Sequence, residues 1–304
     1  MSEYVLETNN LTKTYGRKNA LSDVSLKIRK SDIYGFIGRN GAGKTTAIKL
    51  IAGLTKPTSG EIKLFEDLNL SEGRKKIGVV IENPAFYPYM TARQNIEVQR
   101  IMKGIEDATI TDELLKVVGL SEAENKKAKN FSLGMKQRLG IALALVGDPE
   151  FLILDEPING LDPTGIREIR ELIIKLNQEA GITVLISSHI LGELSKMCTA
   201  YGVINEGKLV AQMTSDELKS QVRSFTKLTV NNPDRAIEIL NNELDILDLK
   251  VDKNIIYIYD SVDRSGEVNS VLAKNDIIVE SISKEEGSYE DYFIKLMQEG
   301  KESA

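Results

Sequence analysis

The segment Gly38-Arg39-Asn40-Gly41-Ala42-Gly43-Lys44-Thr45 decides the fold of this 304-residue chain. It matches the pattern G-x-x-x-x-G-K-[ST], in which glycines let successive backbone N–H groups curl around a phosphate. The apolar stretch 33–37 before it predicts a strand, and apolar residues at helical spacing follow it, at Ile48, Ile51 and Leu54. This context predicts a phosphate-binding loop, in which Lys44 reaches the outer phosphates and the Thr45 hydroxyl ligates Mg²⁺.

Further apolar runs predict the rest of a sheet. Residues 77–81, 151–154 and 182–186 are such runs, and helix-patterned stretches separate them. Runs of this kind are typical of parallel strands buried on both faces, so the sequence predicts an α/β domain over residues 1–220. A helical subdomain is expected at about residues 85–147. Alternation of apolar and polar residues also predicts one half-buried strand over residues 24–28.

The pattern changes after residue 224 and predicts a second domain at residues 225–304. We expect strands at 225–230, 246–251, 255–259 and 277–282, and helices at 234–244, 263–273 and 289–297. The order β-α-β-β-α-β is the ferredoxin-like plan, so the second domain is expected to be a small α+β accessory domain.

Composition limits the function classes. The chain has 39 basic and 45 acidic residues, a formal charge of −6 and a pI near 5.2, which argues against a general nucleic-acid binder. Residues 225–304 carry −8 of this charge and residues 1–224 carry +2. Cys198 is the only cysteine, so the sequence excludes an internal disulfide and a multi-cysteine zinc site, and we expect Cys198 to be a packing residue.

No stretch of about 18 apolar residues predicts a spanning helix, and the N-terminus has no signal-peptide pattern, so we expect a cytoplasmic protein.

Two acids end the predicted strand at 151–154. Alone, Asp155 and Glu156 could be the charged exit of any buried strand. Together with a phosphate loop they indicate hydrolysis of a nucleoside triphosphate, because that reaction needs a carboxylate near Mg²⁺ and a base for the attacking water. We expect Asp155 to be the metal-side acid and Glu156 the general base.

A third segment, Phe131-Ser132-Leu133-Gly134-Met135-Lys136-Gln137-Arg138, resembles the signature motif of ATP-binding cassette (ABC) ATPases. The phosphate loop, Asp155-Glu156, Asn159-Gly160-Leu161-Asp162 and Ser188-His189 complete the ordered motif set of that family over residues 1 to about 220. The resemblance implies an ABC-type P-loop core with an antiparallel β subdomain and a helical insert. It also implies that two chains dimerise head to tail around two ATP molecules.

The resemblance assigns further roles. Ser132 and Gly134 would contact the γ-phosphate bound by the second subunit, although without the family Ser132 would be a simple helix cap. Tyr15 would stack on adenine, with a surface tyrosine as the alternative. The residues expected to hold ATP are Tyr15, Gly38, Asn40, Gly41, Ala42, Gly43, Lys44, Thr45, Thr46, Ser132, Gly134 and Asp162.

His189 is the only histidine of the chain. A lone histidine is more often structural than catalytic. The family, however, places a histidine here to hold the γ-phosphate and orient water, so the expected catalytic set is Glu156, His189 and Lys44.

Two positions depart from the usual family pattern. Leu133 stands where a glycine is common, and Glu82 stands where a Mg²⁺-ligating glutamine is common. A carboxylate can still bind Mg²⁺, so the expected metal ligands are Thr45, Glu82 and Asp155, with a plain charged turn residue as the alternative for Glu82. Glu82 and the signature segment resemble the ATPases of bacitracin and lantibiotic self-protection exporters, which implies the energising subunit of a peptide-antibiotic exporter.

Transport would require separate membrane subunits with several spans, and we expect the chain to meet the inner face of the membrane only through them. The aromatic segment Pro84-Ala85-Phe86-Tyr87-Pro88-Tyr89-Met90 suits a docking groove for a membrane partner, with core packing as the alternative. A soluble ABC ATPase of DNA repair or translation is the alternative function. The segment between Lys44 and Ser132 is short and has no heptad run, and there is one phosphate loop, so both types are disfavoured.

Overall fold

The structure is a computed structural model that describes residues 3–66, 69–222, 224–260, 262–285 and 287–302. The chain divides into two compact units, Met1–Ser215 with Leu296–Ala304, and Asp216–Lys295. The helix α11 (Tyr289–Glu302) therefore begins in the second unit and ends in the first. In the described part of the chain, no helix is long and apolar enough to cross a membrane.

A six-stranded sheet forms the centre of the first unit, in the order β10-β9-β4-β8-β7-β6. Its strands are β4 (Ile33–Ile37), β6 (Ile77–Val80), β7 (Phe151–Asp155), β8 (Thr183–Ser188), β9 (Ala200–Asn205) and β10 (Lys208–Thr214). All neighbours pair in parallel except the edge pair β9–β10. Every residue of β4, β7 and β8 is buried, which explains their continuous apolar runs.

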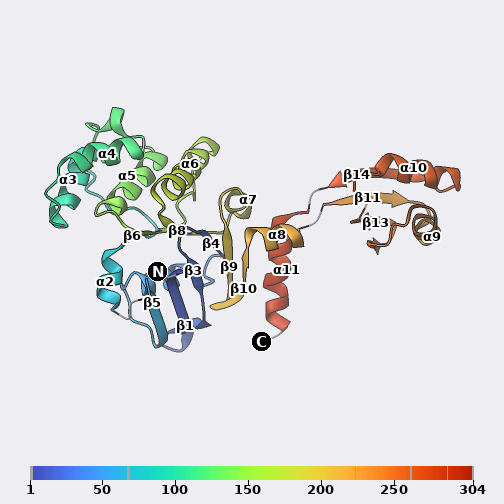
Figure 1. Ribbon diagram of the computed structural model, residues 1–304, viewed down its shortest axis with the longest axis horizontal. Helices are drawn as coiled ribbons and strands as arrows, with labels where there is room; N and C mark the ends of the chain where they lie inside the picture. The colour runs from blue at the N-terminus through green and yellow to red at the C-terminus, as the bar shows by residue number, and fades with distance from the viewer. Residues whose placement is uncertain (1–2, 67–68, 223, 261, 286, 303–304) are drawn as a thin grey trace. The chain divides into compact units, whose positions relative to one another are not determined.

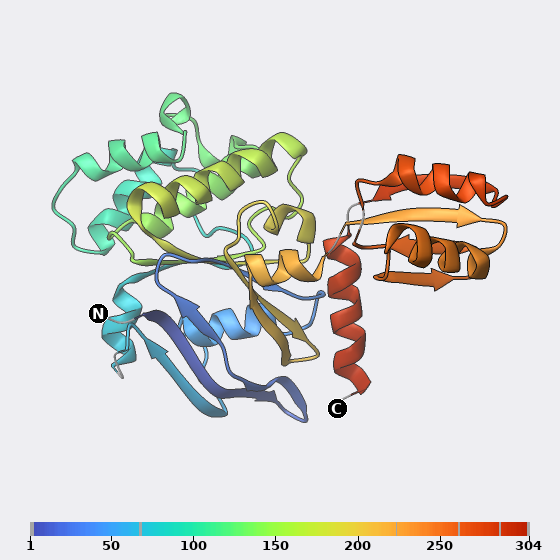
Figure 2. The same cartoon turned by 45° about the vertical axis from the view of Figure 1, so that its right-hand side comes forward.

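A smaller antiparallel sheet covers one face of this unit. It holds β1 (Tyr4–Tyr15), β2 (Lys18–Val24), β3 (Lys27–Arg29) and β5 (Ser59–Leu64), with β1 paired to the other three. The helix α1 (Lys44–Ile51) lies between the two sheets in Figure 2 and shares one apolar core with both. The single strand predicted at residues 24–28 was wrong, since Val24 ends β2 and Lys27 begins β3.

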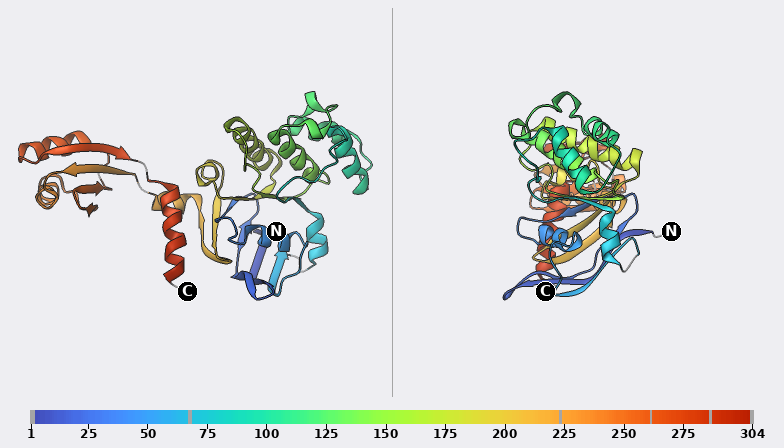
Figure 3. Two further views of the ribbon diagram at one scale, coloured as in Figure 1. Left: turned by 180° about the vertical axis from the view of Figure 1, so that it is seen from behind. Right: turned by 90° about the vertical axis from the view of Figure 1, so that its left-hand side faces the viewer.

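Helices lie on the opposite side of the central sheet, as Figures 1 and 3 show. They include α3 (Ala92–Met102), α4 (Thr109–Val117), α5 (Leu133–Leu145) and α6 (Pro163–Ala180). Local sequence sets their ends: Thr91 forms a capping box with Gln94, Asp162 caps α6 with Pro163 in its first turn, and Gly181 closes α6. The short helices are α2 (Leu70–Lys75), α7 (Leu191–Leu194) and α8 (Ser215–Gln221). Leu54 lies beyond the end of α1 and is exposed, contrary to the predicted apolar stripe.

The second unit has the predicted order β-α-β-β-α-β. It is built from β11 (Phe225–Val230), α9 (Pro233–Leu244), β12 (Leu249–Asp252), β13 (Ile255–Ile258), α10 (Ser265–Lys274) and β14 (Val279–Glu285). The sheet order is β12-β13-β11-β14, and all neighbours are antiparallel. Alternate residues of β11 pack with α9 and α10 in a separate apolar core. The α/β core with an added α+β part is confirmed, and the strand predicted at 246–251 begins only at Leu249.

Candidate nucleotide-binding site

The phosphate loop connects the buried strand β4 to the helix α1. Gly43 ends it with φ +114°, a backbone conformation that side-chain-bearing residues rarely adopt. A Cβ at this position would lie 2.8 Å from the Ala20 carbonyl oxygen and 2.8 Å from Leu21 Cδ2. Only glycine therefore fits where the loop enters the helix, and the first N–H groups of α1 are left to face a ligand.

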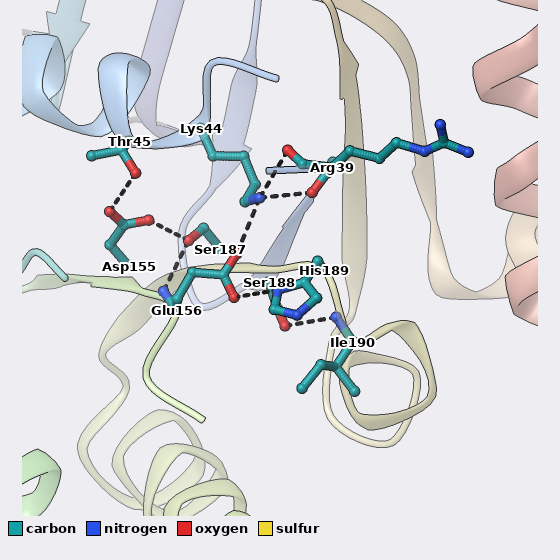
Figure 4. A network of polar contacts seen from close by, with 10 residues as sticks. Arg39, Lys44, Thr45, Asp155, Glu156, Ser187, Ser188, His189 and Ile190 are labelled. Atoms are coloured by element: carbon teal, nitrogen blue, oxygen red, sulfur yellow. Dashed lines mark hydrogen bonds and ion pairs between the residues drawn. The ribbon is translucent and has the colours of Figure 1, made fainter. Parts of the chain in front are cut away.

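Lys44 begins α1 and is buried, with 5% of its side chain exposed. Its ammonium donates hydrogen bonds to the Gly38 carbonyl at 2.6 Å and to the Arg39 carbonyl at 3.3 Å. It also lies 3.0 Å from Glu156 Oε1 (Figure 4). A buried cation is thus held by the loop's own carbonyls and one carboxylate, so an entering phosphate would meet an amine already in position.

Asp155 ends β7 and is 1% exposed. The Thr45 hydroxyl donates to its Oδ2 at 2.7 Å, and the Ser187 hydroxyl donates to its Oδ1 at 2.5 Å. The carboxylate therefore has a fixed orientation beside the first turn of α1. Thr45 and Asp155, predicted as metal ligands, lie next to each other here.

Glu156 follows directly and has φ +51°, a strained conformation for a glutamate. Its backbone N–H donates to Ser187 Oγ at 3.0 Å and to the Ser187 carbonyl at 3.1 Å. Its Oε2 lies 2.9 Å from His189 Nδ1. The structure thus brings Lys44, Glu156 and His189 together from three distant segments, as Figure 4 shows.

A cavity of about 580 Å³ opens above the phosphate loop. Tyr15 stands at its rim with half of its side chain exposed, and the Lys13 ammonium lies 5.0 Å from the centre of its ring. The lining residues are Tyr15, Lys18, Asn19, Ala20, Asn40, Gly41, Gly43, Lys44, Thr45, Thr46, Glu156, Glu206 and Gly207. Seven of the residues predicted to hold ATP belong to this cavity, namely Tyr15, Asn40, Gly41, Gly43, Lys44, Thr45 and Thr46.

The residues present fit a Mg²⁺ ion that arrives with its nucleotide. Thr45 and Asp155 offer oxygen donors, which Mg²⁺ prefers. Within the described residues no group of three His, Cys, Asp or Glu side chains could hold a metal. Glu82 has an exposed carboxylate that lies 3.4 Å from Lys49 Nζ, and its part in metal binding stays a prediction.

Ser132, Gly134 and Asp162 do not line this cavity. Ser132 is exposed and caps α5 by accepting the Met135 N–H at 3.2 Å. Asp162 caps α6 by accepting the Gly165 N–H at 3.1 Å. Ser132 is thus the exposed N-cap of α5, a helix of 13 residues whose N-terminus carries positive potential.

A second cavity, of about 730 Å³, lies between β6 and α5. Pro84 and Ala85 line it together with Ile81, Gln99 and Lys103. Tyr87 and Tyr89 come next in the sequence and are 52% and 73% exposed, so core packing does not account for them.

Sequence patterns did not predict Ser187, and they did not predict five residues of the cavity lining, Lys18, Asn19, Ala20, Glu206 and Gly207. Ser187 contacts both Asp155 and Glu156, because the parallel register of β7 and β8 sets Asp155 opposite Ser187. The only sequence signal was its place at the end of a buried strand, two residues before His189.

A buried lysine on a phosphate loop, a paired aspartate and hydroxyl, and a glutamate–histidine pair together define a nucleoside triphosphate hydrolase of the P-loop class. Comparison with known proteins narrows this class. The family model described as ABC transporter matches residues 21–159. The bacitracin transport ATP-binding protein BcrA of Bacillus licheniformis is 43% identical over 300 residues, 97% of this chain and 98% of the relative.

Two further comparisons agree. The lantibiotic transport ATP-binding protein SrtF of Streptococcus pyogenes is 45% identical over 213 residues, 70% of this chain and 92% of the relative. Among solved structures, the MJ0796 cassette dimer bound to ADP and phosphate is 30% identical with a TM-score of 0.62, and covers 69% of this chain and 98% of its own. The chain belongs to the ABC transporter family as an ATP-binding, ATP-hydrolysing subunit, and the resemblance seen in its motifs is confirmed.

Proposed function

We propose that this chain energises a membrane exporter of peptide antibiotics, by hydrolysing ATP with Lys44, Asp155, Glu156 and His189. The convergence of these side chains on one cavity carries the proposal. Residues 1–220 would form the nucleotide-binding domain and residues 225–304 an accessory domain. Tyr15 would stack on the adenine, and the loop N–H groups, Lys44 and Thr46 would hold the phosphates.

The contacts of Glu156 suggest how ATP would act on the base. Lys44 lies 3.0 Å from Glu156 and takes up one carboxylate oxygen. A γ-phosphate carries more charge than this carboxylate and competes for the same ammonium, which frees Glu156 to accept a proton from water. Mg²⁺ bound with ATP beside Thr45 and Asp155 would neutralise part of the phosphate charge.

His189 orients the base and meets the phosphate from the opposite ring nitrogen. In the contact with Glu156, Nδ1 is the donor, because an ionised carboxylate only accepts. The opposite ring nitrogen, Nε2, is left to meet a γ-phosphate, so we expect His189 to hold Glu156 and the γ-phosphate at the same time.

The experiment is phosphate release by the purified chain with Mg²⁺ and ATP. Glu156→Gln should slow it by about 10²–10⁴-fold while ATP still binds, because the base is lost and the cradle is kept. Glu150→Gln is the matched control, since Glu150 precedes the same strand but pairs with Lys76 at 3.0 Å on the surface. Hydrolysis by Glu156→Gln within a few-fold of the unmodified chain would remove the proposed base.

We further propose a head-to-tail dimer, in which Ser132 and Gly134 of one chain close the cavity of the other and Asp162 connects the two sites. The exposed start of α5 supports this arrangement, because the N-terminus of a helix suits a phosphate. Ser132 and Gly134 do not line the cavity of their own chain, so they can serve the cavity of a second chain. The dimeric MJ0796 structures are of cassettes from the same family.

Exposed Tyr87 and Tyr89, and the cavity lined by the preceding Pro84 and Ala85, support attachment to separate multi-span membrane subunits, which would place the chain at the inner face of the cytoplasmic membrane. Exposed aromatics are suitable anchors for a helix of a partner. Tyr87→Ala with Tyr89→Ala should lose co-purification with the membrane subunits and keep ATP binding. Loss of ATP binding would instead mean that these rings support the fold.

The peptide-antibiotic cargo rests on the relatives, which are bacitracin and lantibiotic transport proteins. Deleting the gene should raise sensitivity to bacitracin or to lantibiotics, and the unmodified gene, but not Glu156→Gln, should restore resistance. Unchanged sensitivity to both classes would rule out this cargo and leave the ATPase itself untouched.

A further inference from the structure

Ser187 lies at the meeting point of the two acids of the site. It is 0% exposed, and its hydroxyl both donates to Asp155 Oδ1 at 2.5 Å and accepts from the Glu156 N–H at 3.0 Å. One side chain on β8 is thereby bonded to the last residue of β7, Asp155, and to the residue that follows it, Glu156 (Figure 4). A hydroxyl has one proton to give and two lone pairs, so these bonds have opposite directions and can exist at the same time.

The bond to Asp155 engages only one of the two carboxylate oxygens. Oδ2 faces Thr45, whose hydroxyl donates to it at 2.7 Å, while Oδ1 faces away and is occupied by Ser187. Any group that displaces Thr45 from Oδ2 would leave the Ser187 bond intact. The orientation of Asp155 is therefore set independently of what binds beside Thr45.

The bond to Glu156 stabilises a strained backbone. Glu156 has φ +51°, and such a conformation persists only where surrounding contacts hold it. Its N–H is shared between the Ser187 carbonyl at 3.1 Å and the Ser187 hydroxyl at 3.0 Å. This conformation turns the Glu156 side chain toward Lys44 and His189, so losing the hydroxyl would let the carboxylate move from that place.

We infer that Ser187 is a positioning residue for ATP hydrolysis: it fixes Asp155 through its proton and Glu156 through its oxygen, without touching the nucleotide. The inference rests on the roles proposed for those two acids. Ser187 is not among the residues that line the cavity, so its effect must pass through them.

The test compares Ser187→Ala with a control from the same strand. Thr183→Ala also removes a buried hydroxyl of β8, one that accepts the Ser31 N–H at 2.9 Å at the other end of the strand. Three quantities are measured for the full-length chain: kcat and KM for Mg-ATP, ATP affinity with Mg²⁺ and with EDTA, and the melting temperature.

Ser187→Ala should lower kcat by about tenfold to a hundredfold, the range expected when a reacting group is slightly misplaced. ATP affinity in EDTA should stay within twofold, because the cradle is intact, and the tightening of ATP binding by Mg²⁺ should become several-fold smaller. Thr183→Ala should lower the melting temperature comparably and leave kcat and both affinities unchanged.

Two results would overturn the inference. One is a kcat for Ser187→Ala within twofold of the unmodified chain, and the other is an equal loss of kcat in Thr183→Ala, which would make the effect one of general stability. Glu156→Gln, measured in parallel, distinguishes a failure of the proposed function from a failure of this inference. If Glu156→Gln is also fully active, the proposed roles of the two acids fail. If Glu156→Gln is inactive while Ser187→Ala is active, only the role of Ser187 fails.

Discussion

Gly43→Ala tests whether the backbone geometry of the phosphate loop creates the nucleotide site. The new Cβ would meet the Ala20 carbonyl oxygen and Leu21 Cδ2, each at 2.8 Å, with φ at +114°. Keeping a non-glycine residue in such a conformation costs about 1–3 kcal/mol. The Ala20 oxygen belongs to the backbone of β2 and cannot swing aside, so the loop itself must move. If the whole cost falls on binding, the Kd for ATP rises by about 5- to 150-fold.

The assay is calorimetric titration with ATP in EDTA, alongside thermal unfolding. Gly181→Ala is the control, because Gly181 has φ +66° at the end of α6 but no atom within 4 Å of the new Cβ. This control should lose about 1 kcal/mol of stability and bind ATP normally. If Gly43→Ala binds ATP as tightly as the unmodified chain and is only as destabilised as the control, the close approach of the loop has no role in binding.

Three further outcomes are expected. His189→Ala should cut phosphate release at least tenfold with ATP affinity kept, and full retained hydrolysis would contradict its role. Hydrogen bonds from Arg100 and Thr111 lower the pKa of Glu97, so its stabilisation is present above its unfolded pKa and is lost as pH falls. Glu97→Gln should therefore lower the melting temperature at pH 7 and lower it less below about pH 4. An equal change in melting temperature at the two pH values would contradict the role of the Glu97 carboxylate. Burial raises the pKa of the Cys198 thiol, so a thiol reagent at pH 8 should modify Cys198 only after unfolding; rapid modification of the folded chain would show that it is accessible.

Much of this site could be predicted from sequence because its parts are local. The phosphate loop, the Asp155-Glu156 pair and the cap at Ser132 each depend on a few adjacent residues, and the structure has the loop and this cap where the pattern placed them. The strands β4, β7 and β8 were also predictable, since burial on both faces requires an unbroken apolar run.

Contacts between distant segments could not be predicted. The pairing of Asp155 with Ser187 depends on strand register, and the ion pair of Glu82 with Lys49 depends on how the chain leaves β6. The antiparallel strand β1 was missed as well, because it mixes buried and exposed residues without regular alternation. A partly buried strand of this kind cannot be recognised from its residue types alone, because strand preference depends on the packing of each face.

We propose that Glu156 of one chain hydrolyses ATP only when Ser132 of a second chain completes the site. The direct measurement is phosphate release by two inactive variants, Lys44→Ala and Ser132→Arg, assayed separately and as an equimolar mixture. In a head-to-tail dimer half of the pairs are mixed and each has one intact site, so the mixture should recover about a quarter of the unmodified rate. A mixture no more active than its separate components would contradict the claim.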